Sequence, residues 1–432
     1  MKRISLSFGK FLLFLVLLFI MQRLMFILFF TSELKGIELS QVLLTFVYGF
    51  PMDVATASSI LLLVALLLLI KIFVQRLRMQ AVVKYVLITA ICLSWISTTA
   101  DIALYESWGT RINSKALSYL AYPGEALKST WSWRYLFLLS VMVFMVIISI
   151  RIFKNILRTD EFEMKRNART VLFTCLAPAI LVVLLRGGFQ KYPLGKSWVY
   201  FSSIASLNQT ALNGLWNFGY ALSQPTEPEI NPYKFFPDEE AKKIVQDLHA
   251  SGNNSLLHIL KSDHPNILMI VLESWGDSVT KREVNGKRIT PQFEAMTNDG
   301  LLFTNFYSPG FRTEQGLAAL VSGFPSQPTT SIVRKYGVFD KLPGLPKSLS
   351  NAGYASSFYY GGSLHFANTD GYLKVMGFEK LVGDENFPES KRTGWGIYDE
   401  ELFKYFIADS KNISQPFFSI VMSCTSHEPF DG

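Results

Sequence analysis

Apolar residues are concentrated before residue 190 of this 432-residue chain. Five runs in that part are long enough to cross a bilayer, which takes roughly 20 apolar residues each. The runs cover residues 11–30, 54–73, 82–104, 135–153 and 170–185. Residues 1–186 are therefore predicted to form a transmembrane domain with five helices.

After residue 186 the pattern changes twice. Residues 187–262 form a predicted extracytoplasmic linker, Pro-rich near residues 223–232 and helical over residues 237–248. From residue 263 onward, short apolar runs alternate with helical patterns, which predicts a mainly parallel sheet with helices on both faces. The predicted strands cover residues 266–272, 301–306, 355–360 and 417–423, and the predicted helices cover residues 313–321, 345–351 and 398–407.

The positions of Lys and Arg predict the orientation of the chain in the membrane. Basic residues precede the first run, flank the turn between the second and third, and fill the loop before the fifth. The loop between the third and fourth runs is also basic, but it carries acids as well. Under the positive-inside rule the N-terminus is cytoplasmic and everything after residue 185 lies outside the cytoplasm. A cleavable signal peptide is disfavoured because the first apolar run is too long and no small-residue cleavage site follows it.

Composition agrees with a membrane protein. Half of the residues are hydrophobic and the mean hydropathy is +0.25, which is high for a soluble protein. The net charge of +7 follows mostly from the basic loops. No stripe of basic and stacking aromatic residues suggests a nucleic-acid partner. The three cysteines, Cys92, Cys175 and Cys424, cannot form a disulfide scaffold, so each is expected to be a small core residue.

Ionisable residues lie at the ends of the predicted spans. Two interpretations are open for Asp53, Asp101, Glu106 and Arg111. They are either solvated at the interface, or they pair in a polar cluster beneath the outer domain, since ionisable groups near a bilayer usually face protein or water.

The candidate chemistry lies between residues 266 and 320. Glu273 ends the first predicted strand of the outer domain, and Thr313 begins the following predicted helix. Strand ends and helix starts converge on one crevice of an α/β sheet. Thr313 can be only a capping residue. Alternatively it is a nucleophile at a helix N-terminus that suits a phosphate, with Arg312 able to clamp phosphoryl oxygens.

A threonine hydroxyl needs a base or a metal ion to become a nucleophile. Glu273 supplies a hard oxygen ligand, although an acid after a buried strand can also be merely solvated. A catalytic divalent ion generally takes three or more protein ligands, so Glu273 and Thr313 do not complete a site.

Three further residues follow other predicted strands. His427 comes after residues 417–423 and can contact a phosphate or a leaving oxygen, although solvent exposure is the default for such a histidine. His365 lies in the loop after residues 355–360 and can face the same crevice. Trp395 is either a lid or glycerol-stacking residue or an ordinary packing residue.

Four motifs carry a family resemblance: Leu272-Glu-Ser-Trp275, Arg312-Thr-Glu-Gln-Gly-Leu-Ala-Ala-Leu320, Gly353-Tyr354 and Ser426-His-Glu-Pro-Phe430. With them, nearly the whole chain resembles the lipoteichoic acid synthase family of phosphoglycerol transferases, within the sulfatase and alkaline phosphatase superfamily. The resemblance implies a five-helix transmembrane bundle followed by an extracytoplasmic α/β sulfatase-like domain, in the inner membrane of a bacterial cell envelope.

The same resemblance implies roles for residues. Glu273 and Thr313 match metal ligands, Thr313 also matches the nucleophile, and His427 matches a substrate-contacting histidine. The implied cofactor is a divalent ion, manganese, magnesium or zinc. The implied partners are a phospholipid donor, phosphatidylglycerol, and a glycan or glycolipid acceptor.

The chain departs from the family in two places. The family completes its metal site with an Asp-His pair in a later strand, so the remaining ligands are expected beyond Gly432 and the domain is expected to be incomplete at its C-terminus. The Trp and Arg that the family places on glycerol phosphate are absent after Gly361, where Phe366-Ala-Asn-Thr369 stands.

The predicted function is transfer of a phosphoglycerol group through a phospho-threonine intermediate. One alternative is phosphoethanolamine transfer, although such relatives carry several disulfides and Cys424 stands alone in the outer domain. A sulfatase-like hydrolase is another, although no Cys/Ser-x-Pro-x-Arg sequence surrounds Thr313. An alternative of a different class is a catalytically inactive lipid-binding or regulatory membrane protein.

Overall fold

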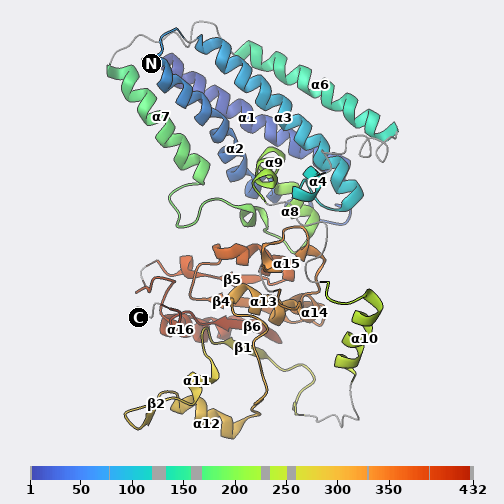
Figure 1. The fold of residues 1–432 in the computed structure, drawn as a ribbon, viewed down its shortest axis with the longest axis vertical. Helices are drawn as coiled ribbons and strands as arrows, with labels where there is room; N and C mark the ends of the chain where they lie inside the picture. The colour runs from blue at the N-terminus through green and yellow to red at the C-terminus, as the bar shows by residue number, and fades with distance from the viewer. Residues whose placement is uncertain are drawn as a thin grey trace.

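The computed structural model describes residues 2–76, 78–118, 133–156, 168–224, 234–250, 259–327, 330–388 and 390–428. The molecule is elongated, with the N-terminal helices at one end and an α/β part at the other (Figure 1). The predictions that concern the basic loop at residues 157–167, the Pro-rich stretch at residues 225–233 and the last four residues of the chain lie outside the described residues.

Each of the five predicted apolar runs lies inside one helix, apart from the last residue of the first run. Four of these helices are long and apolar enough to cross a membrane: α1 (Lys2–Phe29), α2 (Leu39–Phe73), α3 (Met79–Trp108) and α6 (Trp133–Ile156). The fifth, α7 (Ala168–Arg186), is shorter, and its apolar stretch Thr170–Arg186 falls below that length. The predicted helical N-terminal part is confirmed as four to five apolar helices.

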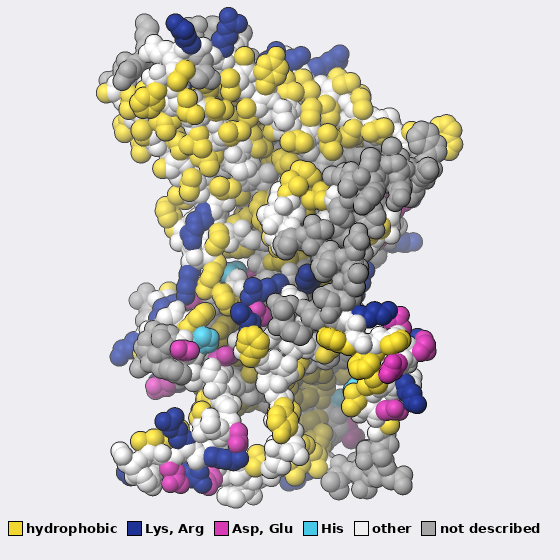
Figure 2. All heavy atoms as spheres, in the orientation of Figure 1, with side chains coloured by type: hydrophobic (Ala, Val, Ile, Leu, Met, Phe, Trp, Pro, Cys, Tyr) yellow, Lys and Arg dark blue, Asp and Glu magenta, His cyan; other side chains and the backbone are white. Residues whose placement is uncertain are grey.

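The surface of the helical part is apolar. Figure 2 shows hydrophobic side chains over this end of the molecule, with Lys and Arg gathered at its tip and mixed charges over the α/β part. Exposed Leu and Phe side chains are what a lipid-facing helix presents.

The expectation that all three cysteines are core residues is wrong for Cys175, which is exposed on α7. Cys424 is buried as predicted, and Cys92 is half-buried.

The α/β part contains a four-stranded parallel sheet, which confirms the predicted architecture. Its strand order is β1 (Ile267–Val271), β6 (Phe417–Met422), β4 (Ala355–Tyr360) and β5 (Lys380–Val382). Met422 is paired with Val271 on one side and with Tyr360 on the other, so three strands end at the same edge. Parallel strands that end together place the loops that follow them around one crevice.

Helices cover both faces of this sheet because its strands alternate between two cores. Phe358 of β4 packs in a core with α13 (Thr313–Ser322) and α15 (Thr369–Met376). The next residue, Tyr359, packs in a second core with α16 (Asp399–Asp409). Helix α14 (Leu345–Asn351) precedes β4, as predicted.

One predicted strand is wrong. Residues 301–306 form an irregular loop with exposed side chains, and Leu301 and Phe303 are 67% and 74% exposed. A strand persists only where a neighbour satisfies its backbone N–H and C=O groups, and no described strand pairs with this segment. The elements of this part that were not predicted include β5, α15, α11 (Asp277–Thr280), α12 (Pro291–Asp299) and the hairpin β2 (Glu283–Val284) with β3 (Lys287–Arg288).

The segment between the membrane helices and the sheet is partly folded. It contains the 3-10 helix η2 (Lys196–Val199), α8 (Ala205–Ala211) and α9 (Gly214–Ser223), and another short helix, α4 (Ser114–Ser118), follows α3. Helix α10 (Asp238–His249) forms as predicted and has no buried residue. Figure 1 shows α8 and α9 between the helical bundle and the sheet, whereas α10 stands at the side of the α/β part.

The ionisable residues at the membrane boundary are paired, but in three separate pairs rather than one cluster. Asp101 lies 2.7 Å from Arg111, as expected, and both are buried. Asp53 pairs with Arg23 of α1, which the sequence prediction did not include. Glu106 pairs with Arg134 near the surface. The alternative of a solvated interface is therefore wrong for Asp53 and Asp101, which are both fully buried.

We expect Asp101→Ala to lower thermal stability strongly, because it leaves the Arg111 guanidinium buried without its anion. Loss of one partner of a buried ion pair typically costs about 3–5 kcal/mol. Asp101 also accepts a hydrogen bond from the backbone N–H of Ile112 at 2.7 Å, which the mutation removes. Thermal unfolding in detergent measures the effect, with Glu106→Ala as the exposed control. Equal melting temperatures for the two variants would contradict the assignment.

Candidate functional site

The backbone around Glu273 is fixed by hydrogen bonds between the ends of β1 and β6. The N–H of Glu273 donates to Ser423 Oγ at 2.8 Å, and its carbonyl oxygen accepts from Ser426 Oγ at 2.6 Å. The next residue, Ser274, has a φ of +61°, a left-handed conformation that is uncommon for a residue with a Cβ atom. The chain therefore turns sharply at the strand end and leaves the Glu273 carboxylate at the carboxyl edge of the sheet.

Thr313 is the first residue of α13. The side chain of Gln315 accepts a hydrogen bond from the N–H of Arg312, which stabilises the start of this helix. The Thr313 hydroxyl lies 3.2 Å from both carboxylate oxygens of Glu273, forty positions away in the sequence. The two side chains that the sequence predicts to act together are thus in hydrogen-bond contact.

The Glu273 carboxylate lies in a site short of positive charge. Burial raises its pKa, and the hydrogen bond from Thr313 and the charge on His427 only partly oppose this. A carboxylate with a raised pKa gains from a nearby cation, because an opposite charge favours its ionised form. The electrostatics therefore suit a bound cation at this position.

The side chains of Glu273 and Thr313 suit a divalent metal ion. A carboxylate and a hydroxyl are hard oxygen donors, the type that magnesium and manganese prefer. Across the described part of the chain, no group of three or more His, Cys, Asp and Glu side chains is arranged to hold a metal. Glu273 and Thr313 thus fit two positions of an oxygen-rich site.

His427, which follows β6, and Trp395, which precedes α16, lie side by side. Their ring centroids lie 4.3 Å apart, and the indole N–H of Trp395 donates to the carbonyl oxygen of Glu428 at 2.8 Å. A Cβ at Gly396 would lie 2.1 Å from the carbonyl oxygen of Gly361, so only glycine lets the Trp395 loop pack this closely on the loop after β4. Both aromatic side chains are therefore held near the strand ends.

Two other predicted residues, His365 and Arg312, have contacts other than with Glu273 and Thr313. His365 binds Asp370 through Nδ1 at 2.7 Å, and its ring stacks on Trp198 of η2 with centroids 5.0 Å apart. The hydrogen bond to Asp370 raises the pKa of His365. Arg312 is exposed, with its guanidinium over the ring of its neighbour Phe311. A substrate role for Arg312 stays a prediction.

Sequence reasoning missed the residues that hold the site together. Ser423 and Ser426 fix the Glu273 backbone, and Asp399 accepts hydrogen bonds from the N–H groups of Cys424 and Thr425 at 2.7 and 3.2 Å. Ser426 precedes His427 at a predicted strand end, which was an available signal. Nothing in the sequence linked Asp399, at the start of α16, to this loop.

The chain is similar to several known proteins. Residues 265–432 match the family model described as Sulfatase. Over 208 residues the chain is 27% identical to the lipoteichoic acid synthase-like YvgJ of Bacillus subtilis, covering 46% of this chain and 33% of that protein. Over 185 residues it is 28% identical to Phosphoglycerol transferase I of Salmonella arizonae, covering 38% of this chain and 24% of that protein.

Among solved structures, the lipoteichoic acid synthase LtaP from Listeria monocytogenes aligns with 39% of this chain and 42% of its own, at 23% identity and a TM-score of 0.36. The matched regions span about one third or less of the two curated relatives. Residues 265–432 are thus similar to the sulfatase family, and parts of the chain are similar to a lipoteichoic acid synthase-like protein and to phosphoglycerol transferases.

Proposed function

We propose that this chain is a membrane-anchored, metal-dependent phosphotransferase that moves a phosphoglycerol group from a phospholipid to an acceptor hydroxyl. The observation that carries the proposal is the contact between Thr313, at the start of α13, and both carboxylate oxygens of Glu273. The relatives named as a lipoteichoic acid synthase-like protein and a phosphoglycerol transferase support the choice of transferred group.

Thr313 is the nucleophile of this reaction. Its hydroxyl lies at a helix N-terminus, where unpaired N–H groups and the helix dipole favour a phosphate. Glu273 orients the hydroxyl by accepting its hydrogen bond. Glu273 and Thr313 would hold a divalent ion, which would lower the pKa of the hydroxyl and neutralise charge on the phosphate.

The reaction runs in two transfers. The Thr313 oxygen forms a bond to phosphorus, the bond from phosphorus to the diacylglycerol oxygen breaks, and diacylglycerol leaves after its oxygen takes up a proton. The hydroxyl of an acceptor, a glycan or glycolipid, then attacks phosphorus and loses its proton, while the bond to Thr313 breaks and threonine regains one. Each transfer exchanges one P–O bond for another.

His427, Trp395 and Arg312 are the substrate-binding residues of the proposal. His427 lies beside the Glu273 carboxylate and can donate to a phosphoryl oxygen. Trp395 presents a half-buried ring next to His427, which suits a glycerol group. Arg312 carries a permanent positive charge next to the nucleophile.

The proposed topology places the N-terminus in the cytoplasm and the sulfatase domain outside it, in the inner membrane of a bacterium. Lys and Arg gather at the end of the helical part that faces away from the sheet (Figure 2), as the positive-inside rule expects for the cytoplasmic side. The donor keeps its acyl chains in the bilayer while its headgroup reaches the crevice.

A side-by-side donor assay tests the headgroup. The purified protein is reconstituted with liposomes that contain labelled phosphatidylglycerol and phosphatidylethanolamine, together with Mn²⁺. We expect diacylglycerol to form from phosphatidylglycerol, because the proposed site binds glycerol through Trp395 and phosphate through His427. The control is Thr313→Ala, in which release from either lipid should stop. Turnover of phosphatidylethanolamine alone would reassign the enzyme to phosphoethanolamine transfer.

A further inference from the structure

Buried charges join the membrane helices to the segment that precedes the sulfatase domain. Arg23 of α1 forms two ion-pair contacts with Asp53 of α2, at 2.8 and 2.9 Å, and also donates to the backbone carbonyls of Thr210 and Ala211. Asn213 donates to the same Asp53 carboxylate at 2.8 Å. The first pair therefore binds the segment 205–217 to the outer end of the helical bundle.

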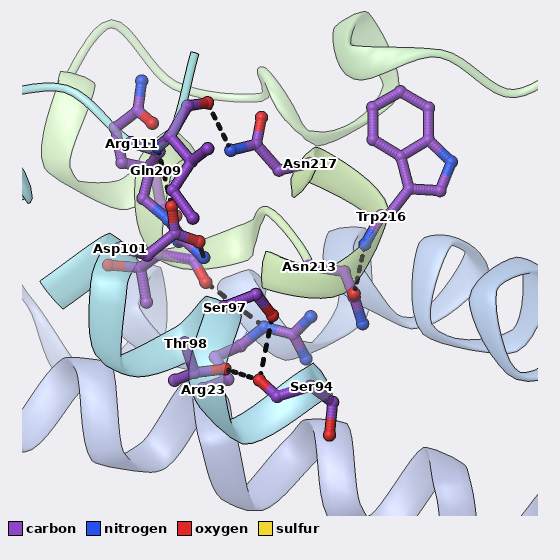
Figure 3. Close-up of polar contacts among 12 residues, drawn as sticks. Arg23, Ser94, Ser97, Thr98, Asp101, Arg111, Gln209, Asn213, Trp216 and Asn217 are labelled. Atoms are coloured by element: carbon purple, nitrogen blue, oxygen red, sulfur yellow. Dashed lines mark hydrogen bonds and ion pairs between the residues drawn. The ribbon is translucent and has the colours of Figure 1, made fainter. Parts of the chain in front are cut away.

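A second pair binds the other side of that segment. Arg111, paired with Asp101 of α3, donates to the carbonyl oxygen of Gln209 at 2.5 Å, and Asn217 donates to the carbonyl oxygen of Ile112 at 2.9 Å (Figure 3). Two independent buried ion pairs, from three membrane helices and the loop after α3, therefore converge on α8, α9 and the loop between them.

The same segment also contacts the sulfatase domain. The side chain of Gln209 donates to Tyr200 at 3.0 Å and to Asp340 at 3.4 Å. The Lys196 ammonium lies over the rings of Tyr220 and Tyr336, with centroid distances of 4.8 and 5.4 Å. Burial lowers the pKa of Lys196 to about 8, against the opposing charges of Asp101 and Asp340. Lys196 thus lies between Tyr220 of α9 and Tyr336 of the sulfatase domain.

Apolar packing follows the same route. One continuous core contains Met52 and Ala55 of α2, Tyr200 after η2, and Leu212 between α8 and α9. The same core contains Leu317 of α13, the helix that begins at Thr313. A Cβ at Gly49 of α2 would lie 2.6 Å from the carbonyl oxygen of Ala211, so the backbones are in direct contact there. Close-packed cores transmit displacement because they have little free volume.

We propose that residues 196–217 are a rigid joint that fixes the catalytic crevice relative to the bilayer, with Arg23, Asp53, Asp101 and Arg111 as positioning residues for a donor lipid in the membrane. The effect of this joint on catalysis rests on the proposed function, whereas its rigidity does not depend on that function.

The first arm of the test measures rigidity without catalysis. Spin labels are placed at two exposed positions, Leu66→Cys on α2 and Ile407→Cys on α16, in full-length protein with Cys92 and Cys175 replaced by serine and embedded in nanodiscs. In the parent protein we expect one narrow distribution of distances between the two labels. Arg23→Gln, which removes a charge, and Gly49→Val, which does not, should both broaden this distribution. The matched control is Glu106→Gln, which breaks the exposed pair with Arg134 at the same boundary.

The second arm compares two donors. Arg23→Gln should lower the rate on phosphatidylglycerol in a bilayer at least about tenfold and change the rate on a water-soluble chromogenic phosphodiester within about twofold, since misplacement by an ångström can cost far more. Arg23→Lys should restore part of the bilayer rate because it restores the ion pair.

The outcomes separate the two proposals. A broad distribution in the parent protein, or an unchanged one in both Arg23→Gln and Gly49→Val, overturns the rigid joint. Equal loss on both donors overturns the positioning role. If the parent transfers neither donor, the proposed function fails, and the spin-label distances still decide whether the joint is rigid.

Discussion

Replacing Thr313 by alanine is expected to lower phosphoglycerol transfer by roughly 10³-fold or more, because removal of a nucleophile leaves only binding and electrostatic catalysis. The side chain is half-buried and its hydroxyl is hydrogen-bonded to Glu273, so its loss should leave the fold intact. Initial rates on phosphatidylglycerol liposomes measure the effect.

Two matched variants sharpen this prediction. Thr313→Ser keeps the hydroxyl and should retain a measurable rate, whereas Thr297→Ala removes a hydroxyl from a half-buried position on α12 and should have no effect. The capping interpretation predicts a different pattern, in which Thr313→Ala lowers thermal stability by about 1 kcal/mol and leaves the rate unchanged. Such a pattern would remove Thr313 from the mechanism.

Replacing Glu273 by glutamine should have the second largest effect. The amide keeps an oxygen that can accept the Thr313 hydrogen bond but removes the negative charge that a divalent ion requires. Because loss of supporting residues alone typically costs 10–100-fold in metal affinity, loss of a ligand should cost at least about 100-fold. Equilibrium dialysis against Mn²⁺, followed by elemental analysis, measures the metal bound to each variant.

The control for this experiment is Glu294→Gln, an exposed acid on α12. The two variants carry the same change in charge, so a non-specific effect on metal uptake should be equal in both. If Glu273→Gln and the parent protein bind Mn²⁺ with the same affinity, Glu273 is not a ligand and orients Thr313 only.

The elements that carry the site were predictable because local patterns mark them. The strand before Glu273 is a continuous apolar run, and helix α13 begins at a polar cluster and ends at Gly323, whose φ is +67°. The rule that parallel strands end on one crevice then places Glu273 and His427, which follow β1 and β6, at the same edge of the sheet. The same rule did not decide the roles of these residues.

The failures have physical causes in particular places. Residues 301–306 carry the apolar pattern of a strand, but pairing depends on a neighbour that the local sequence does not describe. Arg23 was missed because a single basic residue in an apolar run gives no sign of its partner, and Asp53 lies 30 positions away. The ring partner of His365, Trp198, was missed for the same reason, since it comes from η2, far away in the sequence.

The segment between the two parts shows the same limit. Its sequence is rich in residues that favour loops, and only contacts from two domains make it ordered. Gln209, for example, forms hydrogen bonds with Arg111, Tyr200 and Asp340, which come from three different parts of the chain. Long-range polar contacts of this kind have no periodic signature.

The most direct test of the central claim is to identify the atom that carries the transferred group. Full-length protein in liposomes is exposed to phosphatidylglycerol and Mn²⁺ without an acceptor, and its peptides are analysed by mass spectrometry. The account predicts a phosphoglyceryl group on the Thr313 hydroxyl that disappears when an acceptor is added and is missing in Thr313→Ala. An adduct on another side chain, or continued transfer by Thr313→Ala, would contradict it.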